Sequence, residues 1–152
     1  MTKMLVFDMD GTIADLYGIP NWLKLLQEEN TAPYWEADPI VDIEYLSIIL
    51  NELKALGWKI AITSWTSKGG SKAYNKAVAI AKKGWLDMHG FPYDELHIVK
   101  YGTTKANCTR GKADFQILVD DNDKILDGWT LGAVIKADKD LIGKLLSLKK
   151  LF

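Results

Sequence analysis

Two pairs of aspartates stand at opposite ends of this 152-residue chain, and each pair directly follows a short apolar run. Asp8 and Asp10 follow the first run, and Asp120 and Asp121 follow a later one. Carboxylates brought together repel one another strongly unless a cation lies between them. An all-oxygen ligand set suits Mg²⁺, which also accepts a substrate phosphate. Either pair alone is also typical of a turn after a strand, but their joint occurrence favours a magnesium site that handles phosphate.

The positions of these pairs depend on five short runs that are nearly continuous in apolarity and rich in β-branched residues. Such runs are typical of strands that are covered on both faces. They comprise residues 4–7, 59–62, 96–99, 115–119 and 133–135. In a parallel sheet built from such strands, functional side chains collect beyond the carboxyl ends of the strands.

Helical segments separate the apolar runs. Residues 43–56 carry an apolar stripe with a 3.6-residue period, which Gly57 ends as a C-cap. Residues 71–88 and 140–150 are the other predicted helices. Strands that alternate with helices imply right-handed crossovers. We therefore expect an α/β fold, a Rossmann-like three-layer sandwich around a five-stranded parallel sheet.

The segment 15–42 departs from this alternation. A short amphipathic piece is followed by two prolines and the adjacent aromatics Tyr34 and Trp35, which break any regular pattern. We expect a small cap-like insertion after the first strand, within a single domain that spans residues 1–152.

The bulk composition excludes several classes of function. With 19 basic and 20 acidic residues the net charge is −1, which argues against binding of a long nucleic acid through its phosphates. Cys108 is the one cysteine, so no intrachain disulfide can form and a reducing compartment is expected. No stretch approaches the roughly 18 apolar residues of a membrane helix, and no signal peptide is evident. These features predict a soluble, cytoplasmic protein without a membrane partner.

The first acidic pair lies in a more specific pattern. The segment Phe7-Asp8-Met9-Asp10-Gly11-Thr12-Ile13 resembles the first motif of the haloacid dehalogenase (HAD) superfamily. Thr63, a lysine before the fourth strand, and Asp120-Asp121 resemble the second, third and fourth motifs in the same order. The resemblance covers essentially the whole chain. Since an acid stands at position 10, it implies a phosphatase rather than a dehalogenase.

The resemblance also implies roles for individual residues. Asp8 would be the nucleophile that forms an aspartyl-phosphate, and Asp10 the general acid and then the general base. Thr63 would donate a hydrogen bond to the phosphate, with help from Ser64. The metal ligands would be Asp8, Asp120, Asp121 and the backbone carbonyl of Asp10; which of Asp120 and Asp121 binds directly stays open. The remaining residues expected at the substrate are Gly11, Thr12, Ser64, Trp65, Tyr34 and Trp35.

Three lysines lie between the third and fourth predicted strands and compete for the phosphate-binding role. We expect Lys105, in the loop beyond the third strand, to be that lysine. Lys112 is the second choice, and Lys100 is the third candidate.

Within the superfamily, the chain is most similar to the 5′(3′)-deoxyribonucleotidase family. The similarity rests on four segments, which are Ile62-Thr63-Ser64, residues 83–90 with Trp85, Ile98-Val99, and Leu118-Val119-Asp120-Asp121. It implies a small-molecule substrate, a nucleoside monophosphate, whose base could stack on Tyr34 and Trp35. The same two aromatics could instead pack the insertion onto the core. The chain departs from that family's pattern in two ways. Trp65 stands where the family usually has proline, and the insertion is shorter than the family's helical cap.

Two other readings stay open. With a small insertion, the site could accept a larger substrate such as a phosphorylated nucleic-acid end or a phosphoprotein. Alternatively the chain could be a catalytically idle binding module, although all the acidic residues that the chemistry needs are present. The oligomeric state is left open by the sequence.

Overall fold

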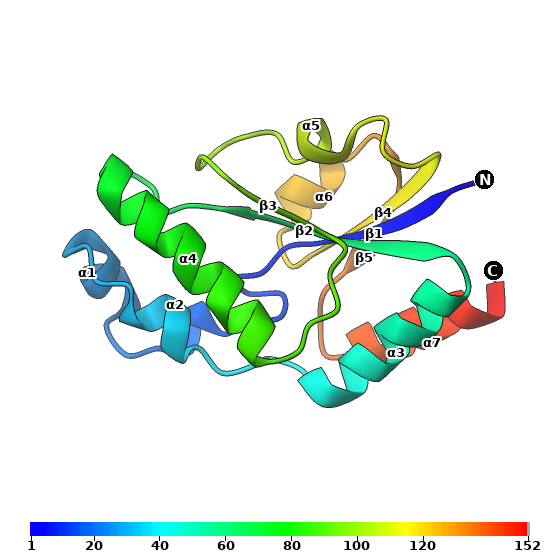
Figure 1. Cartoon of the computed structure of the whole chain (residues 1–152), viewed down its shortest axis with the longest axis horizontal. Coiled ribbons are helices and arrows are strands. Elements are labelled where there is room, and N and C mark those ends of the chain that lie inside the picture. The colour runs from blue at the N-terminus through cyan, green and yellow to red at the C-terminus, as the bar shows by residue number, and fades with distance from the viewer. Residues whose placement is uncertain (152) are drawn as a thin grey trace.

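The computed structural model describes residues 1–151 and contains a single five-stranded parallel sheet. The strand order is β3-β2-β1-β4-β5. The strands are β1 (Lys3–Phe7), β2 (Trp58–Trp65), β3 (Glu95–Val99), β4 (Phe115–Asp120) and β5 (Gly132–Lys136). This architecture confirms the predicted α/β fold (Figure 1).

The central strand β1 places the first acidic pair beside the second. Phe7, its last residue, pairs with Ile62 of β2 on one side and with Val119 of β4 on the other. Because all five strands are parallel, their carboxyl ends meet at one edge of the sheet. The strand order changes direction at β1, which makes this edge the expected place for a ligand.

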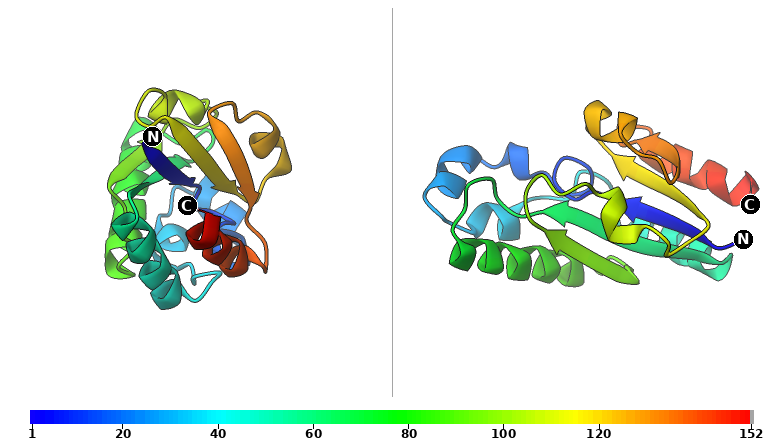
Figure 2. Two further views of the ribbon diagram at one scale, coloured as in Figure 1. Left: turned by 90° about the vertical axis from the view of Figure 1, so that its right-hand side faces the viewer. Right: turned by 90° about the horizontal axis from the view of Figure 1, so that it is seen from above.

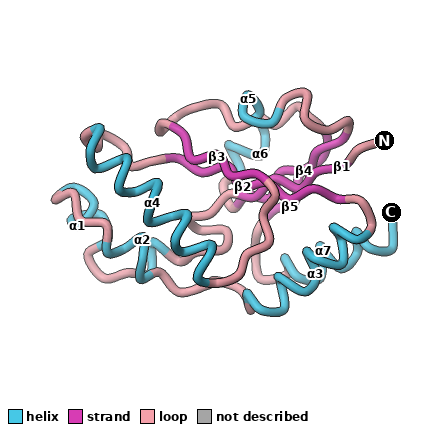
Figure 3. The backbone as a smooth tube through the Cα atoms, viewed as in Figure 1, coloured by secondary structure: helices cyan, strands magenta, loops and turns pink. Residues whose placement is uncertain are grey.

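Helices cover both faces of the sheet, as Figures 2 and 3 show. On one face α3 (Ile43–Ala55), the C-terminal half of α4 (Lys72–Met88) and α7 (Leu141–Leu151) pack against alternate residues of the central strands. On the other face lie α5 (Ala106–Thr109) and α6 (Asp123–Asp127). The three layers bury the whole of β1 after Lys3, which explains its continuous apolar sequence.

The segment between β1 and α3 forms three short helices, η1 (Leu16–Gly18), α1 (Trp22–Gln27) and α2 (Ala32–Glu36). Leu16 and Tyr34 of this insertion pack against the N-terminal half of α4, on Tyr74 and Val78. In Figure 1, α1 and α2 lie beside α4, at the end of the molecule opposite the start of β1. The insertion therefore borders the edge of the sheet where the strands end.

Polar side chains at the helix starts match the predicted boundaries. Asp42 accepts a hydrogen bond from the Tyr45 amide at the start of α3, and Ser71 accepts one from the Tyr74 amide at the start of α4. Both are N-caps of the usual kind. Among residues 1–151, no helix combines the length and the apolar character that a membrane crossing needs.

Candidate active site

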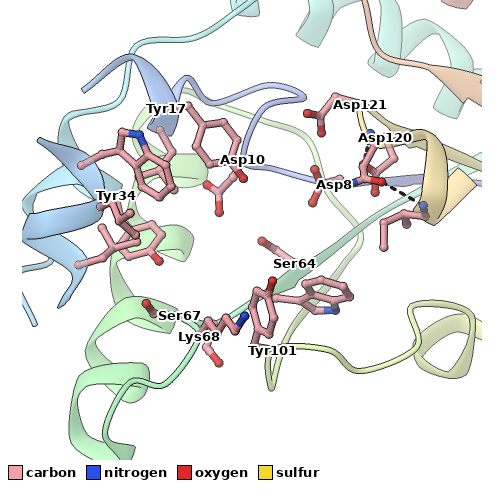
Figure 4. A pocket seen from close by; sticks show the side chains of 18 of the residues that line it. Asp8, Asp10, Tyr17, Tyr34, Ser64, Ser67, Lys68, Tyr101, Asp120 and Asp121 are labelled. Carbon is pink, nitrogen blue, oxygen red and sulfur yellow. Dashed lines mark hydrogen bonds between the residues drawn. The ribbon is translucent and has the colours of Figure 1, made fainter. Parts of the chain in front are cut away.

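A cavity of about 370 Å³ lies beyond the carboxyl ends of β1, β2 and β4. Its walls come from the loops after these strands, from the loop after β3 and from the insertion. Figure 4 shows the acidic side chains at one end of the cavity, Tyr17 and Tyr34 at the other, and Asp10 between them. The two predicted acidic pairs thus line one cavity.

Three carboxylates gather at the acidic end. Asp8, Asp120 and Asp121 each offer an oxygen, and these oxygens all lie within 4.8 Å of one another. The Thr12 hydroxyl bridges the cluster, 3.0 Å from Oδ2 of Asp8 and 3.2 Å from Oδ1 of Asp121. Thr12 therefore holds the loops after β1 and β4 together.

The close approach of the loops after β1 and β4 requires a glycine at position 11. Its φ is +81°, a conformation that side chains disfavour. A Cβ atom at this position would also lie 2.5 Å from Oδ2 of Asp121. The glycine of the acidic motif therefore serves to admit Asp121 into the cluster.

Lys105 is the lysine that reaches the site. Its Nζ donates to Oδ1 of Asp8 at 2.8 Å and to Oδ2 of Asp120 at 2.9 Å, and its side chain is buried. Lys112 instead pairs with Glu95, and Lys100 lies exposed just after β3. Burial by itself lowers the pKa of the Lys105 ammonium, but the charges of Asp8 and Asp120 outweigh it and raise that pKa.

The carboxylates retain an excess of negative charge beside this one ammonium. Burial, followed by the charges of Asp8 and Asp120, raises the pKa of Asp121 to about 6. Burial and the charge of Asp8 also raise the pKa of Asp120. A group of hard oxygen donors with unbalanced charge fits a divalent cation such as Mg²⁺, so the residues present suit the expected metal.

Asp10 lies apart from this cluster and has its own cation. Nζ of Lys82 donates to Oδ2 of Asp10 at 2.8 Å. Burial raises the pKa of Asp10, whereas the Lys82 ammonium acts in the opposite direction. The side chain of Asp10 is 19% exposed and lines the cavity. Its carboxylate is thus held apart from the three-carboxylate cluster.

The two hydroxyls at the end of β2 have different surroundings. Ser64 lines the cavity and accepts a hydrogen bond from Lys82 at 2.7 Å. Thr63 is fully buried, and its Oγ1 has no hydrogen-bond partner among the described residues. Trp65, the last residue of β2, also lines the cavity, and its indole donates to the Thr103 carbonyl at 2.8 Å.

The two adjacent aromatics of the insertion also lie in different surroundings. Tyr34 is buried, lines the cavity and lies under the Lys82 ammonium, 5.1 Å from the ring centroid. Trp35 is absent from the cavity wall formed by the described residues, and its ring lies against Gly84 of α4. The structure thus places Tyr34 at the site and Trp35 at the contact between α2 and α4.

Further aromatic side chains line the rest of the cavity. Tyr17 and Trp22 of the insertion contact each other edge to face, with centroids 4.9 Å apart. Trp65 contacts Tyr101 across a centroid distance of 4.9 Å, and Nζ of Lys68 lies 5.8 Å from the Tyr101 ring. Nζ of Lys105 lies 5.5 Å from the Trp65 ring, so these rings form an apolar wall with two cations beside it.

Lys82 is the main site residue that the sequence analysis did not predict. The buried residues Tyr74, Val78, Ala81 and Trp85 define one stripe of α4, and Lys82 falls on it. A lysine on the apolar stripe of the predicted helix 71–88 is the signal that could have identified it, although the sequence analysis described no stripe there. Tyr17, Trp22 and Tyr101 carried no such signal, because they lie in helices of three and six residues and in a turn.

No protein-family model matches the chain, and no curated protein matches its sequence. Solved structures do match its fold. A chain of a Pnkp1/Rnl/Hen1 complex superposes with a TM-score of 0.58 at 19% identity, covering 90% of this chain and 46% of its own length. A chain of the Pnkp1/Rnl/Hen1 RNA repair complex gives 0.58 at 18% identity, with 91% and 44% covered. This chain therefore spans about half the length of those two.

A third structure matches over nearly its full length. It is the D,D-heptose 1,7-bisphosphate phosphatase from Burkholderia thailandensis, with a TM-score of 0.53, 15% identity and coverage of 97% of this chain and 99% of that one. Together with the five-stranded sheet, these likenesses show a HAD-like fold.

Proposed function

We propose that this chain is a magnesium-dependent phosphomonoester hydrolase that works through an aspartyl-phosphate on Asp8. One observation carries the proposal: Asp8 lies in contact with Lys105, in a cluster with Asp120 and Asp121, at the floor of a cavity that Asp10 also lines. A nucleophile, an acid and compensating charges thus share one cavity.

The first step transfers the phosphoryl group to the protein. A carboxylate oxygen of Asp8 attacks the phosphorus atom, and the bond between phosphorus and the ester oxygen breaks. Asp10 gives its proton to the departing oxygen, which leaves as an alcohol. The Lys105 ammonium and the Thr12 hydroxyl each hold one oxygen of Asp8 and so fix the plane of its carboxylate.

The second step releases phosphate. A water molecule gives a proton to Asp10 and attacks the phosphorus atom of the aspartyl-phosphate. The bond between phosphorus and the Asp8 oxygen breaks, which regenerates the Asp8 carboxylate and protonated Asp10. The sum of the two steps is ester plus water giving alcohol plus inorganic phosphate.

Asp8, Asp120, Asp121 and the backbone carbonyl of Asp10 would hold the magnesium ion. When bound, Mg²⁺ neutralises charge on the phosphate so that an anionic nucleophile can approach it. The hydroxyls of Ser64 and Thr63 would donate to the phosphate oxygens from the end of β2.

The substrate class that we propose is a nucleoside monophosphate. A cavity of about 370 Å³ with aromatic rings on its wall suits a flat apolar group that leaves with the alcohol. A phosphorylated nucleic-acid end is the second candidate. It is favoured by Lys68, an exposed cation beside the Tyr101 ring that could contact a second phosphate.

The covalent mechanism predicts that Asp8→Asn abolishes turnover in the presence of Mg²⁺, because the amide is a far weaker nucleophile. Release of phosphate from nucleoside monophosphates, sugar phosphates and phosphorylated oligonucleotides is measured side by side. Asp127→Asn, an exposed substitution at the end of α6, is the matched control and should keep full activity.

The outcome separates the candidates. Substantial hydrolysis by Asp8→Asn would contradict the covalent mechanism. A preference of the unmodified protein for oligonucleotide ends would replace the nucleotide proposal. Absence of turnover on every ester would favour a binding module.

A further inference from the structure

The ammonium of Lys82 is buried, and each of its three protons has an acceptor. The residue is 1% exposed. Nζ donates to Oδ2 of Asp10 at 2.8 Å, to Oγ of Ser64 at 2.7 Å and to the Trp65 carbonyl at 2.7 Å. Since an ammonium has three donors and no acceptor capacity, these contacts use it completely. Lys82 has no donor left for a substrate.

The three acceptors belong to parts of the chain that meet only here. Asp10 is 72 residues from Lys82 and lies in the loop after β1. Ser64 and Trp65 end β2, and the Tyr34 ring of the insertion lies 5.1 Å from the same Nζ. The ammonium therefore connects the acid, the end of β2 and the insertion.

These contacts decide which atoms of Asp10 and Ser64 remain for the substrate. Oδ2 of Asp10 is occupied by Lys82, whereas Oδ1 accepts no hydrogen bond from any residue among 1–151. Ser64 uses its oxygen to accept from Lys82, so the proton of its hydroxyl stays available as a donor. Both remaining groups belong to side chains that line the cavity.

We propose that Lys82 is a positioning residue, which turns Oδ1 of Asp10 toward the leaving oxygen. The inference rests on the proposed function, since it assigns Lys82 a part in that reaction. A buried ammonium is costly to desolvate, and an apolar residue would fill this place on α4 at no such cost. The three filled contacts explain why a lysine occupies it.

The test uses two esters that differ in their need for an acid. p-Nitrophenolate departs without a proton, whereas the alkoxide of glycerol phosphate needs one. For Lys82→Met we expect kcat/KM on glycerol phosphate to fall about 100-fold, within the usual range for lost general-acid catalysis, and on p-nitrophenyl phosphate to fall much less. Since kcat/KM reports the steps up to departure of the alcohol, the later hydrolysis does not mask the difference. Lys83→Met, at the exposed neighbour that pairs with Asp87, is the matched control.

A second comparison separates positioning from mere support of the fold. In an Asp10→Asn background, the added Lys82→Met change should lower kcat/KM on glycerol phosphate by less than about twofold, because the acid is already lost. This comparison stays available if Lys82→Met alone does not fold, since the double variant leaves no buried carboxylate unpaired. Equal losses on both esters, or a further large loss in the Asp10→Asn background, would overturn the positioning role. No turnover by the unmodified protein or by Lys83→Met would instead overturn the proposed function, and this inference with it.

Discussion

At the scale of single residues, the two adjacent hydroxyls at the end of β2 differ in their hydrogen bonding. The Ser64 oxygen is engaged by Lys82, whereas Oγ1 of Thr63 is buried without a partner among the described residues. A buried hydroxyl without a hydrogen bond costs free energy and calls for an explanation. Under the proposed function, a phosphate bound over Asp8 would supply the missing acceptor.

This view of Thr63 predicts an unusual pair of effects for Thr63→Val, which removes the hydroxyl and keeps the shape. The free energy of unfolding should stay the same or rise by about 1 kcal/mol, because an unpaired buried group is lost. kcat/KM should fall about tenfold, because a donor to the phosphate is lost. Denaturant unfolding and steady-state kinetics measure the two effects. A stable variant with full activity would remove Thr63 from the site and leave Ser64 as the hydroxyl of β2.

At the scale of elements, the insertion is positioned by its contact with α4. A Cβ atom on Gly84, in the C-terminal half of α4, would lie 2.2 Å from the ring of Trp35. The Trp35 ring of α2 therefore packs directly against α4 at Gly84, where no side chain is in the way. On the same helix, the Lys82 ammonium contacts the Tyr34 ring of α2. The contact between α2 and α4 therefore also positions a residue that lines the cavity.

Gly84→Ala should separate α2 from α4 at this point. Alanine favours a helix over glycine by about 1 kcal/mol, yet here the added methyl group meets the Trp35 ring, so we expect a loss of stability and a higher KM. Gly143→Ala in α7, where a Cβ atom meets nothing within 4 Å, is the matched control and should be stabilised by about 0.5–1 kcal/mol. Thermal unfolding and kinetics of the two variants test the contact. A stabilised Gly84→Ala protein with unchanged KM would show that α2 does not help to form the site.

The same elements show how far the sequence can predict this fold. The apolar runs predicted all five strands. For β1, β2 and β4 the reason is that strands covered on both faces must be largely apolar, whereas the edge strand β5 is apolar although its first three residues are exposed. The predicted end of the second strand at Ile62 was too early, since pairing with β3 continues to Trp65 through polar residues. The short helices α5 and α6 escaped prediction, because four or five residues carry no helical period. Lys82 escaped because its place on the apolar stripe of α4 was not used, and only the folded structure shows that the contact partner of its ammonium is Asp10.

At the scale of the whole molecule, the site is assembled from contacts between residues far apart in the chain. Lys105 and Asp8 are 97 residues apart, and Thr12 and Asp121 are 109 apart. The motifs in the sequence predicted that the acidic pairs would meet, because parallel strands bring their carboxyl ends to one edge. Folding must therefore bring carboxylates together. The Lys105 ammonium offsets their repulsion only in part, and the remainder opposes folding in the absence of a metal ion.

That repulsion predicts opposite effects of Asp121→Asn without and with metal. In chelator-treated protein above pH 7, where Asp121 is ionised, the substitution should raise the free energy of unfolding. The pKa of Asp121, raised to about 6, reports an unfavourable carboxylate, and because solvent screens this half-buried group we expect only about 1 kcal/mol. Adding Mg²⁺ at 100 times its dissociation constant should stabilise the unmodified protein by about 2.7 kcal/mol and the variant by much less. Thermal unfolding with and without Mg²⁺ measures both effects, with Asp127→Asn as the control that should follow the unmodified protein. If Mg²⁺ stabilised the Asp121→Asn protein equally, Asp121 would not be a ligand of the ion, and Asp8 and Asp120 would remain as the carboxylates that could hold it.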